Sequence, residues 1–152
     1  MPPLPDIRPV APQDLEALTD MVRHLARFHG DTPSVTSATL ARDCLGQAPW
    51  LRVLVADRGG ALCGYAALCP RARLQFGERG MDLHHLYVQK DLRGCGVGRR
   101  LIEAACDLAR DLGADSVSVG TRADNAAAQQ LYLSTAFQSV TGDGPRFRRR
   151  LA

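Results

Sequence analysis

Aromatic residues, net charge and long apolar runs are all scarce in this chain of 152 residues. Aromatic residues make up 5% of the sequence, and the formal net charge is only +3. A protein that reads nucleic acid usually has a larger basic surplus interleaved with aromatics, so we expect no nucleic-acid partner. No apolar run approaches the roughly 20 residues of a membrane-spanning helix, so we expect no membrane association either.

Paired cysteines and an export signal are also missing. The five cysteines are odd in number and contain no C-x-x-C pair. The start, Met1 to Asp6, lacks the basic and apolar regions of a secretory signal. We therefore expect reduced thiols that mostly fill the core of a cytoplasmic protein. The histidines and cysteines show no spacing typical of a metal site, so we expect no metal.

What is present indicates an ordinary globular chain. Apolar residues make up 45% and charged residues 23% of the sequence. That balance, the length and the lack of repeats favour one domain over residues 1–152. The C-terminal arginines could instead mark a nucleic-acid binder, but a solvated or anion-facing segment is the reading we favour; these are Arg146, Arg148, Arg149 and Arg150.

The first half of the chain predicts a strand followed by two helices. Ile7–Val10 suits a strand at the edge of a sheet, because Pro9 cannot donate to a ladder. A helix is predicted from Pro12, with leucines and a valine at helical spacing, and Gly30 ends it. Thr36 suits the N-cap of a second, shorter helix that carries Leu40, Cys44 and Leu45.

The rest of the chain predicts strands alternating with helices. We expect a loop at 70–80 and a long helix that starts at Val97 and is closed by Gly113. A second helix is expected at 125–134, and strands at 51–56, 61–68, 81–88, 116–119, 137–140 and 147–151. This order predicts a mixed sheet covered by helices, of class α+β or α/β, with a right-handed parallel crossover.

The sharpest motif is the turn Arg93-Gly94-Cys95-Gly96-Val97-Gly98-Arg99 before the long helix. Three alternating glycines leave several backbone N–H groups able to converge on one anion, and the helix start adds unpaired donors. A diphosphate fits that environment. The spacing matches neither the P-loop nor the dinucleotide fingerprint. The alternative is a glycine-rich connector without a ligand.

This turn, with Leu86-Tyr87-Val88 before it and Asn125-Ala126, Leu131-Tyr132 and Ala136-Phe137 after it, resembles the GCN5-related N-acetyltransferase (GNAT) superfamily. The likeness covers nearly the whole chain and is nearest the branch that acetylates diamines and thialysine. It implies a twisted, mostly antiparallel mixed sheet of about seven strands. In the family a central parallel pair of strands splays apart, and about four helices flank the sheet.

The resemblance also implies acetyl-CoA as donor and a role for each matched residue. The backbone of Leu86, Tyr87 and Val88 would pair with the pantetheine arm. Asn125 would lie beside the pantetheine or hold its helix, and Tyr132 would protonate the leaving sulfur or merely pack on the sheet. The diphosphate would be held by the amides of Arg93, Gly94, Cys95, Gly96, Val97, Gly98 and Arg99.

The chain departs from the family pattern at two places. Ala136 stands where the family commonly has glycine before its phenylalanine. His84-His85 stands where the diamine branch typically has Glu-Asp, and this exchange of an acidic pair for two imidazoles argues against a cationic polyamine acceptor. Cys95 at the helix start could be a redox-sensitive thiol, but a small filler residue in the turn is the simpler reading.

Direct acyl transfer needs a neutral amine. A lysine-like ammonium has a pKa near 10.4, so neutralising it at pH 7 costs about 4.6 kcal/mol. An imidazole suits that task, and we nominate His84 first and His85 second. Neighbours on a strand point to opposite faces, so both should not serve equally. Two alternatives stay open: the two histidines have only a structural role, or Glu78 or Asp82 is the base.

The sequence therefore predicts an N-acetyltransferase that moves the acetyl group of acetyl-CoA directly to an amine. The backbone N–H of Tyr87 or Val88 would polarise the thioester carbonyl. The acceptor is a small molecule, such as a diamine or an amino-acid-like compound, or a peptide. A catalytically weak acyl-CoA-binding module is the alternative. Family members are often dimers, so we expect a homodimer.

Overall fold

The computed structural model describes residues 3–140 and 144–151. The chain divides into two compact units, Met1–Gly120 and Thr121–Ala152. The first unit contains the sheet and three of the helices, and the second contains one helix and the C-terminal segment. The single domain expected over 1–152 stays a prediction.

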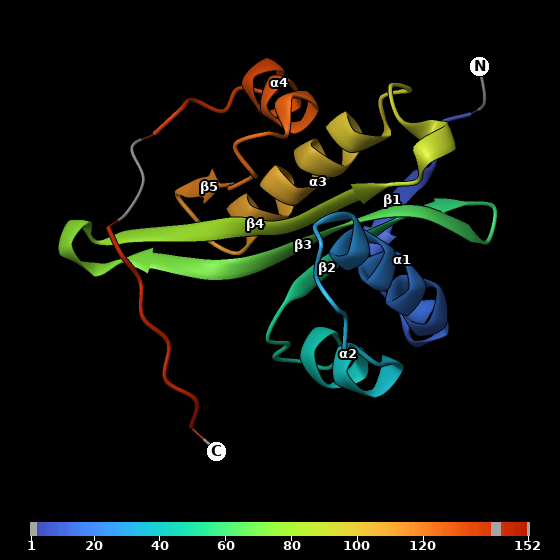
Figure 1. The fold of residues 1–152 in the computed structure, drawn as a ribbon, viewed down its shortest axis with the longest axis horizontal. Coiled ribbons are helices and arrows are strands. Elements are labelled where there is room, and N and C mark those ends of the chain that lie inside the picture. The colour runs from blue at the N-terminus through green and yellow to red at the C-terminus, as the bar shows by residue number, and fades with distance from the viewer. Residues whose placement is uncertain (1–2, 141–143, 152) are drawn as a thin grey trace. The chain divides into compact units, whose positions relative to one another are not determined.

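Five strands form one sheet in the order β1-β2-β3-β4-β5 (Figure 1). All neighbouring pairs are antiparallel except β4 and β5, which are parallel. β1 lies at the edge, as Pro9 predicts. The strands are β1 Asp6–Pro9, β2 Arg52–Arg58, β3 Ala61–Arg73, β4 Glu78–Val88 and β5 Ser116–Ser118.

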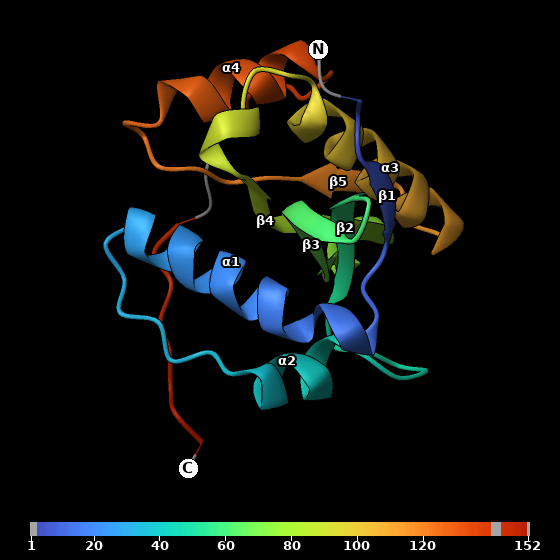
Figure 2. The ribbon, with the colours of Figure 1, turned by 90° about the vertical axis from the view of Figure 1, so that its right-hand side faces the viewer.

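Helices cover both faces of this sheet (Figure 2). α1 (Leu15–Phe28) and α2 (Ser37–Cys44) lie on one face, and α3 (Val97–Asp111) lies on the other. Thr36 caps α2 as predicted, since its side chain accepts from the Thr39 amide. Short 3-10 turns at Pro12–Asp14, Leu74–Phe76 and Lys90–Leu92 connect the elements.

Alternation along β3 and β4 decides which side chains face α1 and α2. Tyr65, Ala67 and Tyr87 belong to one core cluster with Leu18, Met21 and Leu25 of α1. Gly64, between these positions, instead approaches Leu101 of α3. Each large apolar side chain buried in this way contributes about 1.5–3 kcal/mol to folding. The face toward α1 and α2, which we call the α1/α2 face, also carries His85, whose partner on β3 is Ala67.

The prediction of a loop at 70–80 is wrong for most of this segment. β3 and β4 stay paired from Cys69–Asp82 out to Arg73–Glu78, and only residues 74–77 turn. An ion pair of 3.2 Å joins Arg73 to Glu78 at the end of the hairpin. Polar residues stand on both faces of this exposed arm, so the apolar alternation that reveals a strand is missing.

The second unit contains α4 (Ala126–Ser134), near the predicted helix. The strands expected at 137–140 and 147–151 are wrong, because neither segment is a strand in the structure. Among the described residues the sheet therefore has five strands, where about seven were expected. Strand propensity alone is insufficient, since a strand also needs a partner for its ladder of hydrogen bonds.

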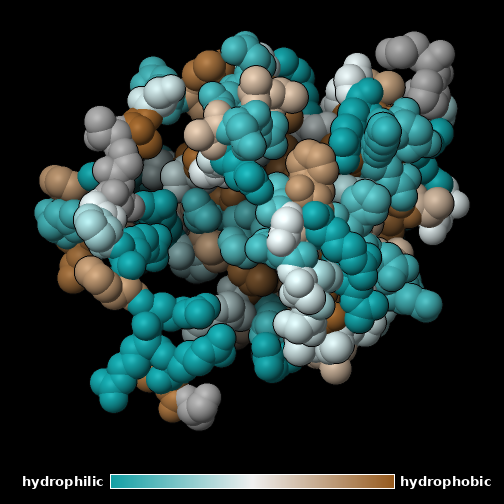
Figure 3. Space-filling model, in the orientation of Figure 1, coloured by the Kyte–Doolittle hydropathy of each residue, from teal (hydrophilic) through white to brown (hydrophobic). Residues whose placement is uncertain are grey.

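Within the described residues no helix has the length and apolar character needed to cross a membrane. The face drawn in Figure 3 is mostly hydrophilic, and its apolar residues are scattered rather than gathered in one patch. All five cysteines are free thiols, but only Cys44 and Cys63 are buried, so the expectation that the cysteines mostly fill the core is wrong for the half-buried Cys69, Cys95 and Cys106.

Candidate active site

One edge of β4 is open over its C-terminal half. β5 pairs only with Gly80–Asp82, so Leu83–Val88 has no strand on that side among residues 3–140 and 144–151. The Gln89 amide donates to Cys63 of β3. Because backbone groups alternate along an antiparallel strand, Tyr87 points to β3 while Leu86 and Val88 point to the open edge. An extended ligand could therefore pair with Leu86 and Val88.

The glycine turn leads directly into α3. Gly94 and Gly96 have φ values of +76° and +90°, in the region that side chains disfavour. Gly96 is the N-cap residue, and in the described part of the chain the first amides of α3 have no side-chain cap. In α2, by contrast, Thr36 supplies a cap. The start of α3 therefore offers backbone donors and roughly half a positive charge to an anion such as a diphosphate.

Arg93 connects this turn to the open edge of β4. Its Nε donates to the Val88 carbonyl at 2.9 Å. Its guanidinium lies 6.0 Å from the ring centres of Phe28 and Tyr87. The half-buried Cys95 thiol contacts the Arg93 carbonyl at 3.8 Å. The side chain of Arg93 thus holds the turn against the strand.

His84 lies at a bulge in β4. His85 pairs with Ala67 and Leu83 pairs with Leu68, so His84 has no partner on β3. The extra residue turns both imidazoles to the same side, where they stack with ring centres 4.3 Å apart and planes 11° from parallel. The expectation that the two rings point to opposite faces is therefore wrong. His84 is exposed, and His85 is half-buried.

His85 has a buried partner in Tyr65, which sequence reasoning missed. The Tyr65 hydroxyl and His85 Nδ1 lie 2.9 Å apart, within hydrogen-bond distance. Burial, with His84 and His29 nearby, lowers the pKa of His85 to about 4. Burial also raises the pKa of Tyr65, which is 1% exposed. Tyr65 shows only core alternation in the sequence, so no sequence signal could have found it.

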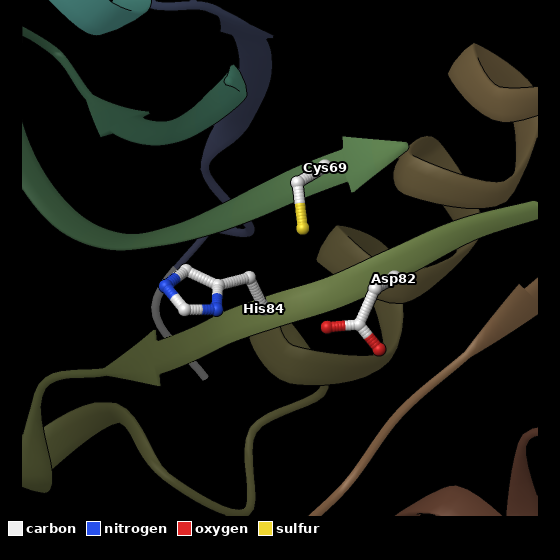
Figure 4. A group of neighbouring side chains, drawn as sticks. All are labelled: Cys69, Asp82 and His84. Carbon is white, nitrogen blue, oxygen red and sulfur yellow. The ribbon is translucent and has the colours of Figure 1, made fainter. Parts of the chain in front are cut away.

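Three groups of different chemistry meet beside the bulge. Cys69 and Asp82 are directly opposed on β3 and β4, and His84 follows Asp82 by two residues. Their sulfur, oxygen and nitrogen atoms all lie within 4.8 Å of one another (Figure 4). Burial and the charge of Asp82 raise the pKa of the Cys69 thiol, while Arg71 lowers it. Spacing along the chain misses this cluster, because only strand register brings Cys69 to Asp82.

Glu78, the other carboxylate considered as a base, accepts hydrogen bonds from two neighbouring side chains. Glu78 accepts from the Ser116 hydroxyl at 2.8 Å and from Arg73 at 3.2 Å. These contacts hold it toward β5 and the end of the hairpin. Asp82 is half-buried, and among the described residues its carboxylate accepts one long bond, of 3.4 Å, from the Ser118 hydroxyl.

Asn125 and Tyr132 belong to the second unit. Asn125 caps α4, its side-chain oxygen accepting from the Ala128 amide at 3.1 Å. This contact agrees with the helix-holding alternative for Asn125. Burial raises the pKa of Tyr132, whose ring meets Phe137 edge-on at 5.7 Å. The phenol therefore keeps its proton at neutral pH. Its role as proton donor to sulfur stays a prediction.

Known proteins similar to this chain agree with these features. The model of the acetyltransferase (GNAT) family matches residues 18–137. A thialysine N-epsilon-acetyltransferase from Bos taurus is 25% identical over 89% of this chain and 85% of its own length. An L-methionine sulfoximine/L-methionine sulfone acetyltransferase from Salmonella typhimurium is 31% identical over 88% of this chain and 79% of its own.

Solved structures agree on the fold. An aminoglycoside N-acetyltransferase in complex with CoA superposes with a TM-score of 0.79 at 22% identity, covering 95% of this chain and 94% of that one. The fold expected from the resemblance is thereby confirmed, although the described residues form five strands rather than about seven. With the open β4 edge and the uncapped start of α3, these matches identify the chain as a member of the acetyltransferase (GNAT) family, an N-acetyltransferase that uses acetyl-CoA.

Proposed function

We propose that this enzyme acetylates the amine of a small amino-acid-like molecule bound on the α1/α2 face beside His84. The observation that carries the proposal is the charge around the bulge. One carboxylate, Asp82, lies beside two imidazoles there, and the positive charge of Arg71 is close enough to lower the pKa of Cys69. An acceptor with both an amine and a carboxylate matches this pair of opposite charges.

The chain's backbone would hold the donor. Acetyl-CoA supplies a thioester whose carbonyl carbon accepts the amine. The open edge at Leu86 and Val88 suits the amide-bearing pantetheine arm, and the amides from Arg93 to Arg99 suit the diphosphate. The left-handed φ values of Gly94 and Gly96 and the lack of a side-chain cap on α3 support this assignment. Alternation favours the Val88 amide over that of Tyr87 for polarising the carbonyl, because Val88 points to the open edge.

His84 is the group we propose as general base. Its exposure makes it accessible to an acceptor, whereas His85 is half-buried and has Tyr65 at its Nδ1. With Tyr65 as donor, the single proton of neutral His85 lies on Nε2. His85 would then position the His84 ring by stacking against it. As the carbon–nitrogen bond forms and the carbon–sulfur bond breaks, His84 takes the amine proton, and the family resemblance alone assigns to Tyr132 the proton that the leaving sulfur needs.

The departure from the diamine branch shapes the choice of acceptor. A diamine presents two cations. The acidic pair of that branch suits them, whereas the imidazoles of His84 and His85 do not. The relative from Salmonella typhimurium is named for derivatives of L-methionine, which supports an amino-acid-like acceptor. Arg71 would pair with the carboxylate of the acceptor, and Asp82 would attract its ammonium group before the proton leaves.

A panel of amines tests this function. Release of free thiol from acetyl-CoA is measured with amino acids, diamines, aminoglycosides and peptides. We expect the value of kcat/KM for the best amino acid to exceed that for any diamine at least tenfold. Arg71→Gln should raise KM for amino acids, with little change for amines that lack a carboxylate. Arg110→Gln, on α3, is the matched control and should behave as wild type. A preference for diamines would contradict the proposal.

We further propose a homodimer in the cytoplasm, on the basis of the resemblance and the reduced thiols. Light scattering on the purified protein measures the mass directly. A mass near twice 16.5 kDa is expected, and a mass near 16.5 kDa at all concentrations would contradict the dimer.

A further inference from the structure

Cys69, Asp82 and His84 project from the same face of two paired strands. Cys69 and Asp82 are cross-strand partners, and His84 follows on the same strand at the bulge. Figure 4 shows the thiol, the carboxylate and the imidazole on one side of β3 and β4. Their donor atoms all lie within 4.8 Å of one another. The proposed acetyl transfer uses His84 and Asp82 but gives no role to the thiol of Cys69 beside them.

We propose that these three residues bind Zn²⁺ or a thiophilic divalent cation of its class. Zinc takes sulfur, imidazole nitrogen and carboxylate oxygen at about 2.0–2.3 Å, which puts neighbouring ligand atoms roughly 3.3–3.8 Å apart in a tetrahedron. The observed separations are within about an ångström of that range, a gap that side-chain rotation closes. The thiol selects against Mg²⁺ and Ca²⁺, which take oxygen ligands.

The surroundings suit an exchangeable ion rather than a structural one. Three protein ligands leave the fourth position to water, the pattern of open zinc sites. His84 is exposed and Cys69 is a free, half-buried thiol, so an ion can enter from solvent. Asp82 accepts a long bond of 3.4 Å from Ser118, which leaves its other oxygen for a metal. The positive charge of Arg71, which lowers the pKa of the Cys69 thiol, opposes the binding of a cation.

Binding of zinc at this site would inhibit acetyl transfer. This consequence rests on the proposed function, in which His84 takes the proton of the amine. A metal-bound imidazole nitrogen has no lone pair left for that proton. The ion would also cover the place beside Asp82 where the ammonium of the acceptor binds. Zinc is therefore a reversible inhibitor, and a chelator restores activity.

The binding test uses the full chain washed with chelator. Zn²⁺ affinity is measured by calorimetry, and Co²⁺ is used as a spectroscopic substitute whose thiolate charge-transfer band reports a cobalt–sulfur bond. Cys69→Ser should abolish that band, and both Cys69→Ser and Asp82→Asn should weaken Zn²⁺ binding by about 10–100-fold or more. Cys106→Ser removes another half-buried thiol, on α3, and should bind as wild type. An unchanged affinity in Cys69→Ser and Asp82→Asn, or a wild type without the band, overturns the site.

Activity is measured separately with acetyl-CoA and the best amine. Equimolar zinc should inhibit the wild type and Cys106→Ser, and EDTA should restore them. Cys69→Ser should need at least tenfold more zinc. Zinc bound through Cys69 without loss of turnover would overturn the inhibition. Absence of turnover with every amine, together with a normal cobalt band, would contradict the proposed function and support the metal site.

Discussion

Acidification should destabilise the fold through His85. Its pKa is about 4 in the folded protein and about 6.5 as an ordinary histidine. Between these two pKa values, His85 therefore binds a proton in the unfolded chain but not in the folded chain. Stability is full above about pH 6.5 and falls as the pH drops toward 4. The shift of roughly 2.5 pH units corresponds to at most about 3 kcal/mol, of which about 2 kcal/mol is lost by about pH 5.

Urea unfolding followed by circular dichroism measures this loss at several values between about pH 7 and 4.5. His85→Gln cannot titrate, so its stability should stay nearly flat over that range while that of the wild type falls. Asp14→Asn is the control. Its hydrogen bonds with Arg8 lower the pKa of Asp14, so its contribution is lost only below about pH 3.8. Parallel curves for wild type and His85→Gln would refute the assignment of a buried neutral imidazole.

Two further substitutions test other parts of the account. His84→Gln should lower kcat about 10²–10⁴-fold with acetyl-CoA affinity unchanged, as steady-state kinetics and calorimetry will measure, and a loss under threefold would contradict its role as base. Ala136→Gly should raise the free energy of unfolding by about 1 kcal/mol, because Ala136 has a φ of +69°. Ala127→Gly, inside α4, should lower it by about 1 kcal/mol in the same denaturant titration, so equal signs would contradict the strain at Ala136.

Local signals in the sequence were enough to predict the elements that carry them. Apolar residues at helical spacing predict α3, and Gly113 ends it with a φ of +84°. Thr36 predicts the start of α2, and the alternating glycines predict the turn before α3. In each case the determinant is a residue within a few positions of the feature it controls, so no knowledge of distant partners is required.

Features set by register could not be predicted in this way. The bulge at His84 arises from how β4 pairs with β3, and a one-residue change reverses the direction of a side chain. The same register brings Tyr65 to His85 and Cys69 to Asp82, pairs that no sequence spacing reveals. The prediction of a strand at 137–140 was wrong for a related reason, because this segment has a strand-like composition but no partner strand among the described residues.

Calorimetric titration of the folded protein with acetyl-CoA tests the central assignment, that the turn at 93–99 binds the diphosphate of the donor. The wild type should saturate well below about 1 mM. Gly96→Ala should bind about tenfold more weakly, because alanine resists the φ of +90° that aims the amides. Absence of binding by the wild type at millimolar acetyl-CoA, or equal affinity in the two proteins, would contradict the account.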